Sequence, residues 1–159
     1  MDFQIHALAA EQFEPLFSLS DADLRAENAI RQTVQSKPGT PCRVSLKDAE
    51  VGETVILVNY IHQPKSSPYQ ASHAIFVREG AATAQPQVNE VPDVLASRLI
   101  SVRAFNAEHM MIEADVMDGD QLPAALRVLF DKPQIAYVHL HNAKPGCFAA
   151  AVTRVGECV

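Results

Sequence analysis

The stretch that decides the fold is Ile135-Ala136-Tyr137-Val138-His139-Leu140-His141, which continues into Asn142-Ala143-Lys144-Pro145-Gly146 and then Cys147-Phe148. Its first part alternates between aliphatic and ring-bearing side chains, a period of two that is typical of a strand with one apolar face. Lys144 to Cys147 fits a β-turn, with proline at its second position and glycine at its third, where φ is positive. Because alternation resumes from Cys147 to Val155, the segment predicts a β-hairpin with a connection of about five residues.

The expected register of this hairpin sets its chemistry. If residues 142–146 form the connection, His141 lies opposite Cys147 and His139 opposite Ala149, with Cβ atoms about 5 Å apart. The imidazoles, the thiol and the small alanines Ala149 and Ala151 would then share one face and leave space for a ligand. The other face would carry Val138, Leu140, Phe148 and Val152. A slip of one residue would place His141 and Cys147 on opposite faces.

Length and charge limit the class of protein. A chain of 159 residues is expected to form a single domain, residues 1–159. The net charge of −6 argues against nucleic acid or an anionic membrane as partner, since both select basic surfaces. No apolar run approaches the ~20 residues of a membrane span, and Met1-Asp2-Phe3-Gln4 lacks the features of a signal peptide. We therefore expect a cytoplasmic protein.

The three cysteines fit that compartment. None belongs to a C-x-x-C pair, so the sequence contains no zinc knuckle and no thioredoxin-type motif. Unpaired cysteines suit a reducing environment. We expect buried thiols, with Cys158 in a frayed tail.

The rest of the chain supplies further strands and few helices. Strand patterns cover residues 3–7, 30–34, 42–46, 54–62, 73–79, 99–105 and 110–117. Helices are predicted after a Ser20 cap, after Pro92, and over residues 121–130 with Asp118 or Asp120 as cap. Helical crossovers are too few for a parallel βαβ sheet. The prediction is an α+β fold, a mixed and mainly antiparallel β-sheet with a few helices packed on it.

Polar clusters fall at strand ends and turns, where functional groups concentrate. They lie at Cys42-Arg43, at residues 59–63, at residues 69–73 and at residues 139–147. His139 and His141 have the spacing that puts two imidazoles on one strand face, and His62, His73 or Cys147 would complete a zinc-type site. Because H-x-H is common and no acidic ligand stands beside it, we assign no metal ligands from sequence.

Two other chemistries fit the same residues. Cys147 near His141 would make a thiolate–imidazole pair oriented by Asn142. Alternatively, Arg43, Arg78 or Arg103 would hold a carboxylate or phosphate through charge-assisted hydrogen bonds. The structural alternative is a set of hydrogen-bonded histidines and cross-strand salt bridges. No P-loop, G-x-G-x-x-G, G-x-S-x-G or H-E-x-x-H is present.

Several motifs occur in an order that resembles a known family. They are Pro41-Cys42-Arg43-x-Ser45-Leu46, Asn59-Tyr60-x-His62-Gln63, Pro68-Tyr69-x-x-Ser72-His73-x-Ile75-Phe76-Val77-Arg78-Glu79, Arg103-Ala104-Phe105 and His139-x-His141-Asn142-Ala143-x-Pro145-Gly146-Cys147. Together they resemble a small bacterial family catalogued as domain of unknown function number twelve-oh-three. The resemblance implies a bacterial, single-domain protein. It supplies no reaction, cofactor or site.

The sequence thus predicts a small-molecule or anion pocket lined by histidine, cysteine and arginine. The catalytic candidates are His141, as proton shuttle or ligand, Cys147, as thiol, and His73. The ligand-binding candidates are Cys42, Arg43, His62, Tyr69, His139 and Asn142. The alternative is a non-catalytic binding or interaction module. Cofactor, substrate, enzymatic activity and oligomeric state stay open.

Overall fold

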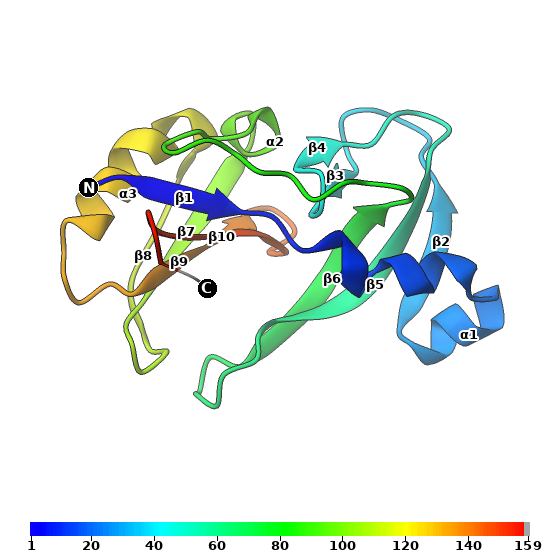
Figure 1. The fold of residues 1–159 in the computed structure, drawn as a ribbon, viewed down its shortest axis with the longest axis horizontal. Helices are drawn as coiled ribbons and strands as arrows, with labels where there is room; N and C mark the ends of the chain where they lie inside the picture. Colours follow the sequence, from blue (N-terminus) through cyan, green and yellow to red (C-terminus); the bar gives the residue numbers. More distant parts are fainter. Residues whose placement is uncertain (158–159) are drawn as a thin grey trace.

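The computed structural model describes residues 1–157, and Cys158, which the sequence places in a tail, lies outside the described residues. The described strands form two five-stranded sheets that lie side by side (Figure 1). Three α-helices accompany them. The predicted α+β class with mainly antiparallel strands is confirmed. The division into two sheets was not predicted, because alternation identifies strands but not their partners.

The first sheet has the order β1-β10-β9-β7-β8, and every neighbouring pair is antiparallel. Its central strand β9 is the one quoted from the sequence. The predicted hairpin over residues 99–117 is confirmed as β7 and β8. The strands are β1 (Phe3–His6), β7 (Leu99–Phe105), β8 (Met111–Asp118), β9 (Tyr137–Asn142) and β10 (Phe148–Arg154).

The second sheet has the order β2-β5-β6-β3-β4, with a single parallel contact between β3 and β6 at Cys42 and Phe76. Its core is the long antiparallel pair β5–β6, and the strands predicted over residues 54–62 and 73–79 are confirmed as its two members. The strand expected over residues 42–46 is shorter, because the chain turns after Cys42. The strands are β2 (Ala29–Thr33), β3 (Pro41–Cys42), β4 (Lys47–Asp48), β5 (Thr54–Gln63) and β6 (Ala71–Arg78).

The helices are short, and α3 (Leu122–Phe130) packs on one face of the first sheet. The Ser20 hydroxyl accepts a hydrogen bond from the Asp23 N–H, which confirms the predicted cap of α1 (Asp21–Ala26). The predicted aspartate cap of α3 is wrong: the 3₁₀ turn η3 (Gly119–Gln121) leads directly into the helix without a side-chain cap. The others are η1 (Ala10–Gln12), η2 (Glu14–Ser18) and α2 (Asp93–Ala96). No helix within residues 1–157 is both long and apolar enough to cross a membrane.

The predicted register of the β9–β10 hairpin is wrong by one residue. Asn142 and Cys147 close the hairpin through a 2.9 Å hydrogen bond from the Asn142 N–H to the Cys147 carbonyl, so the connection is residues 143–146. His141 consequently pairs with Phe148, and a bulge before Ala150 shifts the register again so that His139 pairs with Ala151. Because side chains alternate between faces, His141 and Cys147 lie on opposite faces of the hairpin.

The two largest hydrophobic cores of the described residues follow from this arrangement. One fills the space between α3 and the face of the first sheet that carries Val138 and Leu140. The other belongs to the second sheet, with Ile56 and Ile75 at its centre, and it also takes up Phe148 from β10. The histidine-bearing face of β9 is therefore turned toward the second sheet.

Replacing Gly119 with alanine should destabilise the fold by about 1–3 kcal/mol. A Cβ atom at this position would lie 1.9 Å from the Leu95 carbonyl oxygen and 2.8 Å from the Ala96 Cα, both backbone atoms that cannot rotate away. Urea denaturation measures the loss. Gly52→Ala is the control: its surroundings are open, and only its φ of +89° opposes a side chain, so its effect should stay near 1 kcal/mol. Equal effects would contradict the steric explanation.

Candidate functional site

The hairpin β9–β10 presents different chemistry on its two faces. His139 and His141 project from one face, where His62 of β5 meets them. Asn142 and Cys147 project from the other, where they meet Arg43. The pocket that the sequence predicts as one site is thus divided between two groups of residues, which we call the histidine trio (His62, His139 and His141) and the thiol cleft (around Arg43, Asn142 and Cys147).

The histidine trio joins the two sheets. One ring nitrogen of each residue lies within 4.8 Å of those of the other two. The His62 ring centroid is 4.8 Å from that of His141 and 6.0 Å from that of His139. The pairing of β5 with β6 becomes irregular between Tyr60 and Gln63, the segment that carries His62. Such bulges commonly redirect a side chain beside a functional site.

Each ring of the trio has one nitrogen that is out of contact with solvent and has no hydrogen-bond partner among the described residues. These atoms are His62 Nδ1, His139 Nδ1 and His141 Nε2. His62 as a residue is partly exposed, but this nitrogen is not. A buried polar atom without a partner costs about 1–3 kcal/mol. Three such atoms at one place need a physical explanation.

The tautomer of His141 follows from its one hydrogen bond. Its Nδ1 lies 2.9 Å from the carbonyl oxygen of Gly146, which can only accept, so Nδ1 carries the proton. The unpartnered Nε2 therefore holds a lone pair. The turn brings the Gly146 carbonyl next to His141, and Gly146 has the positive φ, +79°, that the sequence predicts there.

All three imidazoles are neutral at neutral pH. Burial lowers the pKa of His62 to about 4 and those of His139 and His141 to about 3. The positive charge of Arg103, which pairs with His139 across β7–β9, lowers each pKa further. For His141 the hydrogen bond to Gly146 acts in the opposite direction but is weaker than burial.

Aromatic rings surround the trio. Phe148 stacks on His62 with centroids 5.5 Å apart and meets the edges of the other two rings. Tyr137 stacks on Phe105, and its hydroxyl lies 2.8 Å from Gln63 Nε2 and 3.0 Å from His109 Nδ1. Tyr69, a predicted ligand-binding residue, packs edge-on against Phe105 at 6.0 Å and so lies at the margin of this group.

The thiol cleft is centred on a buried arginine. Arg43 is 2% exposed, and it donates through Nε to the Phe148 carbonyl at 2.6 Å, through Nη1 to the Pro41 carbonyl and through Nη2 to Cys147 Sγ at 2.9 Å. No ion pair within residues 1–157 includes Arg43. Burial disfavours the charged guanidinium and lowers its pKa. Asn142 Nδ2 also approaches the sulfur, at 3.5 Å, while its Oδ1 is buried and has no hydrogen-bond partner within residues 1–157.

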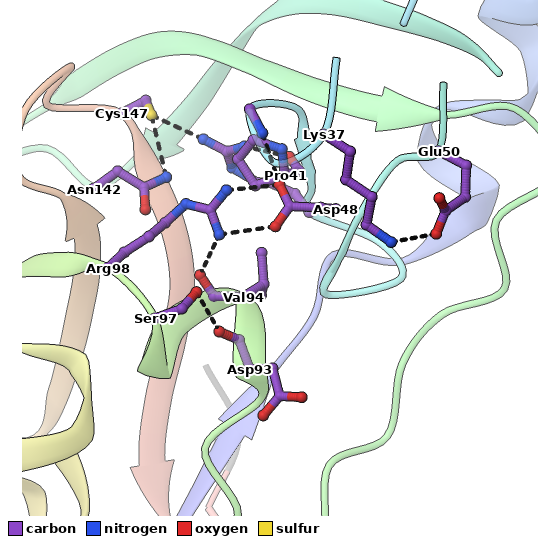
Figure 2. Close-up of polar contacts among 12 residues, drawn as sticks. Lys37, Pro41, Asp48, Glu50, Asp93, Val94, Ser97, Arg98, Asn142 and Cys147 are labelled. Atoms are coloured by element: carbon purple, nitrogen blue, oxygen red, sulfur yellow. Dashed lines mark hydrogen bonds and ion pairs between the residues drawn. The ribbon is translucent and has the colours of Figure 1, made fainter. Parts of the chain in front are cut away.

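A cavity of about 530 Å³ opens beside these residues. Figure 2 shows Asn142 and Cys147 next to Arg98, whose guanidinium forms a two-pronged ion pair with Asp48 at 2.6 and 3.0 Å. The polar lining consists of Arg43, His73, Ser97, Arg98, Asn142, Lys144 and Cys147. Because Asp48 neutralises Arg98, the cations of this wall without an ion-pair partner in residues 1–157 are Arg43 and Lys144.

The predicted residues are therefore partly united. His73 and Cys147 share the thiol cleft with Arg43 and Asn142, whereas His141 lies on the other face. Cys42 lines neither group closely: its sulfur accepts the Ser45 and Arg78 backbone N–H groups. Sequence analysis missed Arg98 and Lys144. For Lys144, its place in the Pro-Gly turn was a usable signal; for Arg98 there was none.

Comparison with known proteins gives a family and nothing further. The sequence model of the family described as "Protein of unknown function (DUF1203)" matches residues 39–154, which is well over half of the chain. The matched range includes the histidine trio and the residues of the thiol cleft. No curated protein and no solved structure matches the chain.

Proposed function

The chain belongs to the DUF1203 family, and we propose that it binds a small anionic molecule, a carboxylate or phosphate, in the thiol cleft. In this proposal Arg43 is the anion anchor, Asn142 and His73 are polar contacts, and the Cys147 thiol lies beside the bound molecule. The observation that carries the proposal is a guanidinium, nearly fully buried, without a carboxylate partner in residues 1–157 at the wall of a 530 Å³ cavity.

The donor count of Arg43 supports this role. A guanidinium has five N–H groups, and the described contacts account for only some of them: one at each of its three nitrogens. An uncompensated buried charge is unfavourable, and the partners present are two carbonyls and a thiol. An anion in the cleft would supply the missing negative charge and accept from the remaining donors.

The local charge is opposite to that of the whole protein. The chain carries −6 overall, yet Arg43 and the exposed Lys144 give this wall a positive potential. A concave, positively charged wall raises the local concentration of small anions. The cavity also falls within the size range of small-molecule sites.

A purely structural role is the alternative, and one observation favours it. Two of the three Arg43 contacts go to backbone carbonyls of different sheets, Pro41 and Phe148, so the side chain also connects the two sheets. The two readings differ in what they predict for the thiol.

Alkylation of Cys147 distinguishes them. We expect anionic iodoacetate to react faster relative to neutral iodoacetamide at Cys147 than it does at the thiol of uncharged 2-mercaptoethanol, by roughly threefold to tenfold. Peptide mass spectrometry measures each rate at constant ionic strength. Inorganic phosphate should slow iodoacetate more than iodoacetamide. Cys42, 1% exposed with its sulfur occupied by two N–H groups, is the internal unreactive control.

Lys144→Gln tests the charge without touching the fold, because Lys144 is exposed. It should reduce the iodoacetate preference at Cys147, whereas Lys65→Gln, the same charge change in the loop between β5 and β6, should not. A preference equal to that of 2-mercaptoethanol, unaffected by Lys144→Gln and by phosphate, would refute the anion site and leave Arg43 as a connector of the sheets.

A further inference from the structure

We propose that His62, His139 and His141 bind one divalent transition-metal ion, with Zn²⁺ as the probe that fits best. The three residues come from two sheets and are distant in sequence, yet a ring nitrogen of each lies within 4.8 Å of the others. This site is separate from the thiol cleft, because the two occupy opposite faces of the β9–β10 hairpin. Either proposal can therefore fail without the other.

The spacing is close to what an ion requires. Zinc binds imidazole nitrogen at about 2.0–2.1 Å in tetrahedral geometry, which places ligand nitrogens about 3.4 Å apart. The most widely separated nitrogens of the trio would approach each other by up to about 1.4 Å. His62 comes from the irregular segment of β5, which is partly exposed and so is the element best able to move.

The protonation state is already suitable. The Gly146 carbonyl accepts a hydrogen bond from the Nδ1–H of His141, so the lone pair of Nε2 is directed away from that bond. A metal-binding histidine typically donates its second ring N–H in this way to a backbone carbonyl or carboxylate, which fixes the tautomer and the ring orientation. Neutral imidazole is the form that binds metals.

Aromatic packing alone does not explain the trio. Phe148 stacks on and borders the rings, and phenylalanine at the three positions would fill such an interface without buried polar atoms. The observed residues instead leave His62 Nδ1, His139 Nδ1 and His141 Nε2 unpartnered within residues 1–157. A single cation would satisfy a lone pair on each ring at once.

The donor set selects the class of metal. Imidazole nitrogens suit zinc and its transition-metal neighbours, whereas calcium and magnesium require oxygen ligands. Three protein ligands are the number found in zinc sites that keep a fourth position for water or a bound molecule. Because the ligands are neutral and Arg103 lies opposite His139, we expect the fourth ligand to be an anion.

The test uses tag-free full-length protein that has been treated with chelator and titrated with Co²⁺ and then Zn²⁺. We expect one equivalent of Co²⁺ to give the visible absorption of a four- or five-coordinate centre, and Zn²⁺ to displace it and raise the melting temperature. His62→Gln should weaken Zn²⁺ binding by more than about 100-fold, since even the loss of an outer hydrogen-bond partner costs 10–100-fold.

His6→Gln is the matched control, a histidine of β1 that lies outside the trio and whose Nε2 is hydrogen-bonded to the Thr153 hydroxyl. It should bind Zn²⁺ like the natural protein. Circular dichroism confirms that both variants are folded, and His62, at the partly exposed end of β5, is the ligand whose loss the fold tolerates best. Binding of well under one equivalent by the natural protein, or equal affinity in both variants, would overturn the proposal.

Discussion

Replacing Arg43 with methionine should lower the free energy of unfolding by about 2–4 kcal/mol, from two carbonyls left without a donor less the recovered cost of the buried charge. The side chain extends from the second sheet to the first, where its Nε donates to the Phe148 carbonyl at 2.6 Å. Methionine fills similar volume but leaves the carbonyls of Pro41 and Phe148 buried without that donor. Unlike a buried ion pair, these backbone acceptors cannot be removed together with the arginine. Urea denaturation followed by circular dichroism measures the loss.

Two variants sharpen this experiment. Arg78→Met removes an arginine of the same sheet whose ion pair with Glu53 is partly exposed, so its effect should stay below about 1 kcal/mol. Arg43→Lys keeps the charge, but its single ammonium lacks the fork that reaches three separate acceptors. It should therefore recover less than half of the loss. A change of less than about 1 kcal/mol in Arg43→Met would contradict a connecting role.

Acidification from pH 7 to pH 5 in the presence of chelator should lower the free energy of unfolding by about 2–4 kcal/mol through His139 and His141. Burial lowers the pKa of both to about 3 in the folded protein, against about 6.5 in an unfolded chain. Below pH 6.5 these two imidazoles bind protons in the unfolded chain but stay neutral in the folded protein. Stability is therefore complete above about pH 7 and falls as the pH drops toward 3.

Urea midpoints at pH 7, 6 and 5 measure this slope. His139→Gln removes one of the titrating groups. It should reduce the number of protons taken up on unfolding, which sets the slope, by up to about one, whatever its effect on stability at pH 7. A natural protein whose midpoint is constant between pH 7 and pH 5 would contradict the burial of neutral imidazoles at the trio.

The histidines show how much of the candidate site the sequence predicts. The alternation around His139 and His141 correctly placed the two imidazoles on one strand face, because side chains of a strand alternate whatever the tertiary context. His62 was only one of three residues, with His73 and Cys147, that the sequence offered to complete a site with them. Its meeting with the other two depends on the approach of the second sheet, which no local pattern encodes.

Cys147 illustrates the opposite case. The Pro-Gly turn was recognised, and Gly146 has the expected positive φ. A connection one residue shorter than expected, closed by Asn142 and Cys147, nevertheless moved the thiol to the other face. Turn chemistry restricts loop length to a few values, and each change of one residue exchanges the two faces.

The sequence by itself determined the α+β class, the position of most strands, the Ser20 cap and the polar residues from which a site can be built. These features follow from interactions between near neighbours along the chain: alternation, propensity, turn residues and capping. Only the tertiary structure decided that the strands form two sheets, that Phe148 rather than Cys147 faces the histidines, and that Arg43 lies beside the thiol. The face of Cys147 depends on the length of one short connection, closed between Asn142 and Cys147. The other outcomes depend on contacts between residues far apart in the chain, such as the 2.9 Å approach of Arg43 Nη2 to Cys147 Sγ, about 100 positions away, and hydrophobic packing of whole sheets selects among them.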